Sequence, residues 1–226
     1  MELMLDSADL GELKRGLADW PVSGVTTNPT ILRRAGESDV WAQLQKIRAL
    51  AGDLCSLHVQ VVADDTAAML EEAALIREKL GEETFIKVPV SAAGLPAIKA
   101  LAAEGVNVTA TAIYTPLQGM LAVMAGARYV AVYFSRIARQ GGDPERVVRE
   151  LVTFIDSNRF DCRLLAASFH APEEVARAYA AGAHSATVAP AVLRAGLGAP
   201  EIAKAVADFA ADFAALRGAA GDLRSL

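Results

Sequence analysis

The sequence predicts an α/β protein folded as a (β/α)8 TIM barrel, with an extra C-terminal helix at about residues 199–217. Three observations predict this fold class. Short apolar runs alternate strictly with longer segments of helical periodicity, which gives parallel strands joined by right-handed crossovers. Eight such units are the number that closes a barrel, and polar residues gather at one end of the expected strands. A length of 226 residues suits one barrel, so we expect residues 1–226 to form a single domain.

Eight short segments are the expected strands. They are rich in Leu, Val, Ile and Thr, which suits a parallel sheet covered by helices. In chain order they are residues 2–6, 24–27, 57–62, 84–90, 106–112, 129–134, 163–168 and 185–189. Hydrophobic residues make up 53% of the chain and aromatic residues only 6%, so the core must be built mainly from aliphatic side chains.

Seven segments between these strands are the expected helices, because each has apolar residues at i, i+3 and i+4. Several begin with Asp, Thr or Pro and end with Gly, the residues that helix ends favour. They lie within residues 8–20, 39–52, 65–81, 92–105, 115–126, 143–155 and 171–183. Beyond Pro200, a further helix has an apolar stripe that packs either on its own barrel or on a neighbouring subunit. The stripe consists of Ile202, Val206, Phe209, Phe213 and Leu216.

Alternate residues of a barrel strand face the helices and the barrel interior. One set is apolar and is expected to face the helices: Leu3, Leu5, Leu57, Val59, Val61, Ile86, Val88, Val108, Ala110, Val130, Val132, Leu165 and Ala167. The opposite set places polar residues at or just after the C-terminal strand ends: Asp6, Thr26, Asn28, Gln60, Lys87, Thr111, Tyr133 and Ser168. Barrel enzymes have their catalytic groups at this end, so we expect a functional site there.

Lys87 is the most informative of these residues, because a lysine is almost never fully buried unless it is paired. At a strand edge it would be a solvated surface residue. Inside a barrel, burial lowers the pKa of the amine and makes it nucleophilic. A neutral amine attacks ketones, and the iminium that forms withdraws electrons from the neighbouring carbon–carbon bond. The position of Lys87 therefore predicts aldol cleavage through a Schiff base.

Asp6 is the one acidic residue at a strand end on the expected inner face. We expect it to hold donor hydroxyls and help move protons, and the alternative is a helix N-cap. Gln60, Thr111 and Tyr133 have the hydroxyl and amide groups that fix a water near an imine. Each of the three alone would also suit an ordinary barrel layer. His58 shares the parity of Gln60 but lies deeper in its strand, so we expect it in the core.

Charge and cysteine content argue against several kinds of partner and ligand. A net charge of −5 without a basic cluster argues against nucleic acid or an anionic membrane surface. No apolar run approaches the roughly 20 residues that span a membrane, and the first ten residues do not resemble a signal peptide. Cys55 and Cys162 lack the spacing of a disulfide framework or a zinc site, so the expected compartment is the cytoplasm.

Six segments of the chain form a recognisable set of motifs, namely LDSADL (5–10), GVTTNP (24–29), KVPVSAAGL (87–95), TAIY (111–114), YFSRIARQGG (133–142) and LAASF (165–169). With these segments the chain resembles the fructose 6-phosphate aldolases and small microbial transaldolases, a family of class I aldolases. The resemblance covers nearly the whole chain. It implies a (β/α)8 fold, no metal or organic cofactor, and an imine at Lys87. The substrate-binding residues that it implies are Asp6, Thr26 and Asn28, with phosphate contacts from Arg136 and Ser168.

Within this family, Gln60 with Tyr133 is the aldolase pairing, since typical transaldolases have Glu and Phe at these positions. The pairing implies reversible cleavage of fructose 6-phosphate, or a related ketose, to dihydroxyacetone and glyceraldehyde 3-phosphate. The first alternative is a transaldolase that transfers a dihydroxyacetone unit between sugar phosphates. The second is a barrel that only binds a sugar phosphate, and such a barrel would be expected to have lost Lys87 or Asp6.

The sequence departs from the family at His170, where Lys or Arg is usual two residues after the phosphate-binding serine. Histidine is mostly uncharged near neutral pH, so we expect weaker phosphate binding and better tolerance of unphosphorylated aldehydes. Arg139 either compensates or faces solvent. The resemblance also implies a homo-oligomer, a pentamer or decamer, with the C-terminal helix reaching across to a neighbour.

Overall fold

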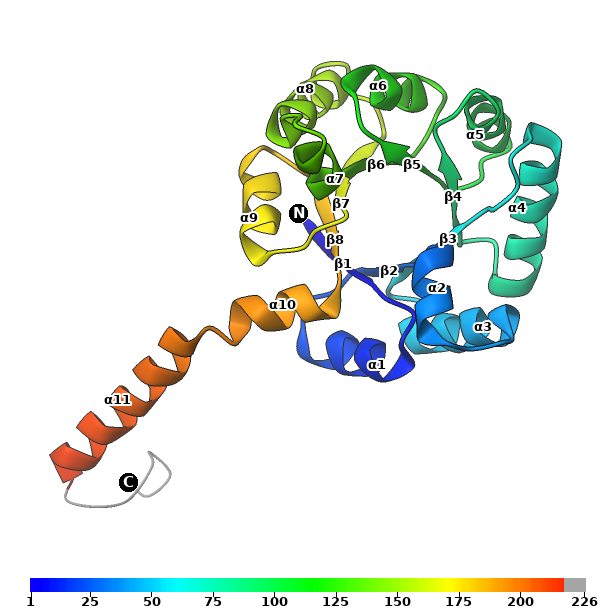
Figure 1. Ribbon diagram of the computed structural model, residues 1–226. Helices are drawn as coiled ribbons and strands as arrows, with labels where there is room; N and C mark the ends of the chain where they lie inside the picture. Colours follow the sequence, from blue (N-terminus) through cyan, green and yellow to red (C-terminus); the bar gives the residue numbers. More distant parts are fainter. Residues whose placement is uncertain (218–226) are drawn as a thin grey trace.

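Eight parallel strands close into a barrel in the computed structural model, which describes residues 1–217 (Figure 1). The strands follow one another around the barrel in chain order, and β8 pairs with β1, from Glu2 with Ser185 to Leu5 with Val188. The predicted (β/α)8 barrel is therefore confirmed. The strands are β1 (Glu2–Asp6), β2 (Gly24–Thr26), β3 (Ser56–Gln60), β4 (Phe85–Pro89), β5 (Val108–Ile113), β6 (Tyr129–Tyr133), β7 (Arg163–Ala167) and β8 (Ser185–Val188).

Helices surround the barrel, and all seven helices expected between the strands form close to their predicted bounds (Figure 1). Four of them begin at an Asp whose side chain accepts a hydrogen bond from the backbone N–H three residues on, namely Asp9, Asp39, Asp65 and Asp143. The seven are α1 (Leu10–Asp19), α3 (Val40–Ala51), α4 (Thr66–Leu80), α5 (Gly94–Ala103), α6 (Pro116–Met124), α8 (Pro144–Ser157) and α9 (Pro172–Ala180).

Three short helices were not expected: α2 (Pro29–Ala35), α7 (Phe134–Arg139) and α10 (Pro190–Leu197). Helix α2 has full end signals, because Asn28 accepts from the Ile31 N–H at its start and Gly36 adopts a left-handed φ of 80° at its end. Helix α7 has no side-chain cap and follows directly on β6. These helices lie just after the C-terminal ends of β2, β6 and β8, so they border the end of the barrel where the site is expected.

The predicted alternation is correct on most strands. The core between barrel and helices contains the expected residues of β1 and β3 to β6, including Leu5, Val88 and Val132. The prediction for Leu165 and Ala167 is wrong, because Leu164 and Ala166 face the helices instead. Leu165 packs inside the barrel, with Met4, Tyr129 and Ala131. The prediction assumes that Ser168 continues the alternation of β7. Ser168 has a left-handed backbone with a φ of 66°, so it does not continue the strand and the alternation counted from it is off by one residue.

The interior below the predicted site is filled by a layer around His58. Its ring stacks on Phe85 at 4.5 Å between centroids and meets Tyr129 edge-on at 5.3 Å. Nδ1 lies 2.8 Å from the Thr109 hydroxyl and Nε2 lies 3.0 Å from the Ser56 hydroxyl. Burial lowers the pKa of His58 to about 3, and the nearby charge of Lys87 adds to this effect. His58 is therefore a neutral core residue, as its depth in the strand predicts.

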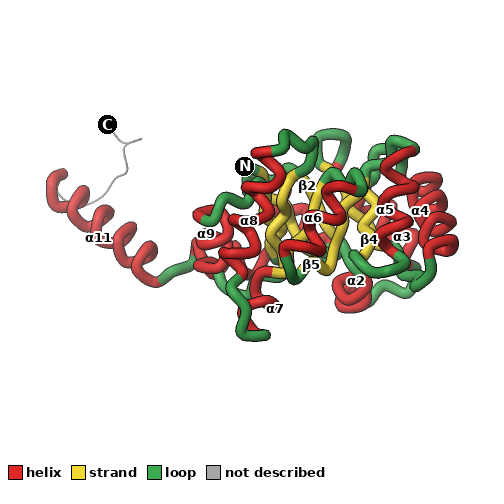
Figure 2. The backbone as a smooth tube through the Cα atoms, turned by 90° about the horizontal axis from the view of Figure 1, so that it is seen from above, coloured by secondary structure: helices red, strands yellow, loops and turns green. Residues whose placement is uncertain are grey.

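Helix α11 (Pro200–Arg217) extends away from the barrel (Figures 1 and 2). Packing on its own barrel, one of the two expectations, is therefore wrong. Its apolar stripe is open to solvent, with Phe209 71% and Leu216 84% exposed. Of the helices described within residues 1–217, none is long and apolar enough to cross a bilayer. Residues 218–226 of the predicted tail lie outside the described residues.

Candidate active site

A small cavity of about 60 Å³ opens at the C-terminal end of the barrel. Seven of its lining residues have predicted roles: Asp6, Asn28, Lys87, Thr111, Tyr133, Arg136 and Ser168. They come from β1, the start of α2, β4, β5, β6, α7 and the segment after β7. The structure therefore brings together most of the predicted site, and the two remaining residues, Thr26 and Gln60, lie close by in different surroundings.

Lys87 projects from the middle of β4 into the barrel and is only 5% exposed. Its Nζ donates a hydrogen bond to the backbone carbonyl of Thr27 at 2.8 Å. Burial lowers the pKa of Lys87, and the negative charge of Asp6 partly opposes this effect. A neutral amine keeps its lone pair while one N–H bonds the Thr27 carbonyl, so the side chain is oriented and can still act as a nucleophile.

Asp6 at the end of β1 is the carboxylate of the cavity. Its Oδ1 accepts a hydrogen bond from the Thr26 hydroxyl at 2.6 Å, and the Thr26 oxygen lies 2.6 Å from the Thr187 hydroxyl. Burial raises the pKa of Asp6, while the charge of Lys87 and the hydrogen bond from Thr26 oppose the rise. Thr26 is fully buried behind Asp6, so it orients the carboxylate and does not line the cavity.

Thr111, Tyr133 and Arg136 contact one another in sequence on the wall of the cavity formed by β5, β6 and α7. Residues with predicted catalytic and phosphate-binding roles are therefore in contact. The Thr111 hydroxyl donates to the Tyr133 hydroxyl at 3.3 Å. The guanidinium of Arg136 lies over the ring of Tyr133, 4.5 Å from its centroid, and Arg136 also donates to the Tyr114 hydroxyl at 3.5 Å. Tyr114 meets the Tyr133 ring edge-on at 5.5 Å. Arg136 is thus held by two aromatic residues at the cavity and can bind an anionic group there.

Ser168 lies just beyond β7 in a left-handed backbone conformation, with a φ of 66°. A non-glycine residue adopts this conformation only where the surrounding structure holds it. Phe169, the next residue, packs against Phe134 of α7 with ring centroids 5.7 Å apart. Ser168 and Arg136 therefore reach the same cavity from neighbouring segments.

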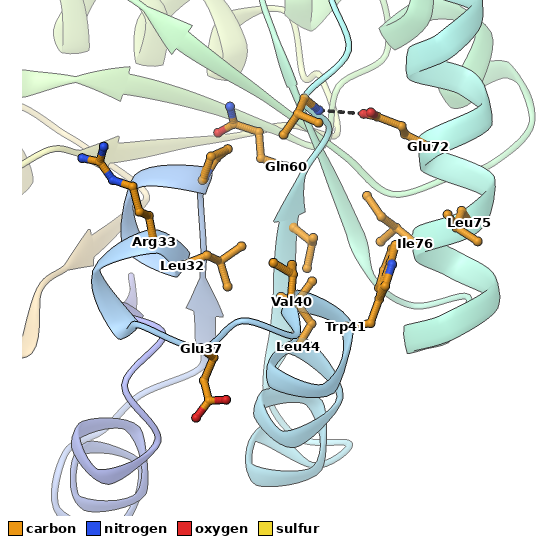
Figure 3. A pocket seen from close by; sticks show the side chains of 13 residues that line it. Leu32, Arg33, Glu37, Val40, Trp41, Leu44, Gln60, Glu72, Leu75 and Ile76 are labelled. Carbon is orange, nitrogen blue, oxygen red and sulfur yellow. Dashed lines mark hydrogen bonds between the residues drawn. The ribbon is translucent and has the colours of Figure 1, made fainter.

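Gln60, the last residue of β3, does not line this cavity. It lies at the end of a largely apolar groove of about 550 Å³ between β3 and helices α2, α3 and α4 (Figure 3). Its Oε1 is buried and has no hydrogen-bond partner among the described residues. A buried amide oxygen without a partner is costly, and a water molecule is the usual solution. The groove is lined by Leu32, Val40, Trp41, Leu44, Leu75 and Ile76, among others.

Sequence reasoning missed Thr187 of β8, which lines the cavity and contacts Thr26. The signal was present, since Ser185 and Thr187 alternate with apolar residues in the last strand. It also missed the apolar floor of the cavity, formed by Ala131, Leu165 and Ala167. Within residues 1–217, no three His, Cys, Asp or Glu side chains gather closely enough to hold a metal ion.

Comparisons with known proteins bear on the family and on the fold of the chain. Residues 3–222 match the family model described as Transaldolase/Fructose-6-phosphate aldolase. A "Probable fructose-6-phosphate aldolase" of Streptococcus pneumoniae is 44% identical over 213 residues, covering 94% of this chain and 96% of that protein. Among solved structures, a "(Putative)lactate oxidase" of Pediococcus acidilactici superposes with a TM-score of 0.59 at 14% identity, over 83% of this chain and 62% of that one. This last likeness shows the fold alone.

Proposed function

Because the chain belongs to the transaldolase and fructose-6-phosphate aldolase family, we propose that it is a class I aldolase that forms a Schiff base at Lys87. Its proposed reaction is the reversible cleavage of fructose 6-phosphate, or a related ketose, to dihydroxyacetone and glyceraldehyde 3-phosphate. The observation that carries the proposal is the buried amine of Lys87, which has a lowered pKa and a fixed orientation. Such an amine is prepared to attack a ketone.

The proposed reaction follows from the groups around Lys87. The amine attacks C2 of the ketose, and loss of water gives an iminium. Asp6 takes the proton from the C4 hydroxyl, the C3–C4 bond breaks, and its electrons flow into the iminium to leave an enamine. A water molecule bound by Tyr133, Thr111 and Gln60 then protonates C3, and hydrolysis of the iminium frees dihydroxyacetone and Lys87.

In the same proposal, Asn28 binds hydroxyls of the donor and Thr26 orients Asp6. Arg136 and Ser168 bind the phosphate of the aldehyde product. The cation of Arg136 at the rim of the cavity supports this role, because phosphate requires a charged donor. No metal or organic cofactor takes part in any of these steps.

Transaldolase activity is the second candidate, and one observation favours it. The Gln60 amide is outside the cavity lining and makes no hydrogen bond to Tyr133 or Thr111. If no water bridges Gln60 to this pair, the enamine would be protonated slowly and would persist until a second aldose arrived. The three-carbon unit would then be transferred and not released.

Release of glyceraldehyde 3-phosphate from fructose 6-phosphate separates the two candidates. A coupled dehydrogenase follows the release with and without erythrose 4-phosphate as a second aldose. Steady release without erythrose 4-phosphate, abolished by Lys87→Met, is the result expected of an aldolase. Release that requires erythrose 4-phosphate would make the enzyme a transaldolase. Failure of borohydride to trap dihydroxyacetone on Lys87 would overturn the Schiff-base proposal.

We also propose that the protein is a homo-oligomer in which α11 packs on a neighbouring copy. The exposed apolar stripe of α11 supports this, because an isolated amphipathic helix with Val206, Phe209 and Leu216 in solvent is unfavourable in a monomer. Burial against a second copy would remove this apolar surface from water. The family resemblance suggests a pentamer or a decamer.

A further inference from the structure

The two proposed phosphate ligands belong to different strand–helix units. Arg136 lies on α7, which follows β6, while Ser168 lies in the segment between β7 and α9. The backbone pairing of β6 with β7 ends at Tyr133 and Ala167, before either ligand. Beyond that point, side-chain contacts must set the separation between α7 and the segment 168–171.

One carboxylate oxygen connects these two segments. Oε2 of Glu174, in the first turn of α9, accepts a hydrogen bond from the Ser135 hydroxyl at 2.6 Å. The same oxygen accepts from the backbone N–H groups of His170 at 2.7 Å and Ala171 at 3.2 Å. Ser135 directly precedes Arg136 and is only 1% exposed, so its hydroxyl has little freedom to choose another partner.

We propose that Glu174 is a positioning residue that holds Arg136 and Ser168 at the spacing that binds a phosphorylated aldehyde. The inference rests on the proposed aldolase function and deepens it, because it assigns the preference for phosphorylated acceptors to a residue outside the cavity. Glu174 acts through Ser135 on the Arg136 side and through the backbone of His170 and Ala171 on the Ser168 side.

Capping of α9 alone does not account for these contacts. A capping box explains the bond from the Ala171 N–H, which belongs to the N-cap of α9. It does not explain the bond from Ser135, which lies 39 residues earlier on another helix. Partial burial would raise the pKa of Glu174, but the hydrogen bonds from Ser135, His170 and Ala171 outweigh it and lower the pKa. The carboxylate is therefore ionised at neutral pH and makes strong, directional bonds.

A second contact joins the same segments, the packing of Phe134 against Phe169. Apolar packing holds two segments together but is not directional, so it fixes spacing less tightly than hydrogen bonds to an ionised group. The variants below distinguish the two contributions, because they leave both phenylalanines in place.

The test uses aldol addition of dihydroxyacetone to two acceptors, glyceraldehyde 3-phosphate and unphosphorylated glyceraldehyde. The readout is kcat/KM for the phosphorylated aldehyde divided by kcat/KM for the unphosphorylated one. Glu174→Ala is expected to lower this ratio about tenfold or more, through a higher KM for the phosphorylated aldehyde, because misplacement of a binding group by about 1 Å is costly. Ser135→Ala is expected to lower it in the same direction by less, although the cap of α9 stays intact.

Two matched variants serve as controls. Glu174→Gln is expected to keep most of the native ratio, because its amide oxygen can accept the same hydrogen bonds, although without the charge that strengthens them. Glu173→Ala removes the exposed neighbouring acid in the same helical turn and is also expected to keep it. The inference is overturned if Ser135→Ala keeps the native ratio, or if Glu174→Ala lowers kcat/KM equally for both aldehydes. Ser135→Ala still decides the question if Glu174→Ala does not fold.

Binding of inorganic phosphate, measured by calorimetry, separates this inference from the proposed function. If the native protein binds phosphate but cleaves no ketose, and Glu174→Ala weakens that binding while Glu173→Ala does not, the aldolase proposal fails and the positioning role stands. If the native protein is an aldolase and phosphate binding is the same in both variants, the positioning role fails and the aldolase proposal stands.

Discussion

Replacement of Tyr133 by Phe tests the proposed protonation step most directly, because it removes one hydroxyl and leaves the ring. The ring contacts should survive, namely the Arg136 guanidinium at 4.5 Å and the Tyr114 edge at 5.5 Å. Within residues 1–217, the hydroxyl has one hydrogen bond, from Thr111 at 3.3 Å. A long, neutral and partly exposed bond of this kind contributes about 1 kcal/mol or less to the free energy of unfolding.

The expected effect on turnover is much larger. A positioned proton-transfer group contributes about 10²–10⁴ in rate, which corresponds to about 3–5 kcal/mol of activation free energy. We therefore expect Tyr133→Phe to release glyceraldehyde 3-phosphate from fructose 6-phosphate at least about 100-fold more slowly without a second aldose. Borohydride should still trap dihydroxyacetone on Lys87, because the amine and its Thr27 carbonyl contact are unchanged.

Tyr129→Phe is a matched control, since the Tyr129 hydroxyl donates to Glu2 at 2.8 Å at the far end of the barrel. This variant should lose some stability but keep native turnover. Thermal unfolding of both variants separates loss of folded protein from loss of chemistry. A Tyr133→Phe enzyme with native turnover in the absence of erythrose 4-phosphate would refute the assignment of the protonating water to Tyr133 and Thr111.

Three further predictions concern charge and assembly. Borohydride trapping of dihydroxyacetone on Lys87 should rise with pH through the lowered pKa of Lys87. Asp6→Asn removes the proposed base for cleavage but should still form the Schiff base, and its trapping should rise at lower pH, because the Asp6 charge raises the pKa of Lys87. A trapping profile that does not move would contradict the coupling. His58 binds a proton more readily when unfolded, so the free energy of unfolding should fall from about pH 6.5 towards pH 3, by at most about 5 kcal/mol, and His58→Gln should flatten this slope in denaturant titrations. Truncation after Ala199 should leave the barrel folded by circular dichroism but reduce the molecular mass in light scattering, and an unchanged mass would exclude α11 from the interface.

Most of the barrel could be predicted from the sequence because two periodicities act together. A repeat of two in the strands and of 3.6 in the helices places the apolar residues of β1 and β3 to β6 in one core. The short helices α2 and α10 were missed although each begins with Pro, at Pro29 and Pro190, because neither is long enough to show a full apolar repeat. Helix α7 has no capping signal at all, so no local rule predicts it.

The site was predictable where a strand delivers its residue and less so beyond the strand ends. Asp6, Lys87 and Thr111 follow from strand parity, and all three line the cavity. The positions of side chains beyond the strand ends depend on backbone turns that alternation does not describe. The left-handed backbone of Ser168 is such a turn, and it puts the predicted inward and outward faces of β7 off by one residue. The placement of Gln60 at the neighbouring groove likewise depends on how α2 and α3 pack, which the sequence of β3 alone does not determine.

Closure of the barrel by β8 and orientation of the site carboxylate are connected through Thr187 of β8. Thr26 donates its one hydroxyl proton to Asp6, so in the contact between Thr26 and Thr187 the donor must be Thr187. The bonds therefore form a directed chain from β8 through β2 to the carboxylate on β1, and β1 is the strand that pairs with both. Burial raises the pKa of Asp6, and the charge of Lys87 and the hydrogen bond from Thr26 partly oppose that rise. Thr187 on β8 therefore helps to orient the Thr26 hydroxyl that bonds Asp6, so closure of the barrel by β8 supports the geometry of the proposed base.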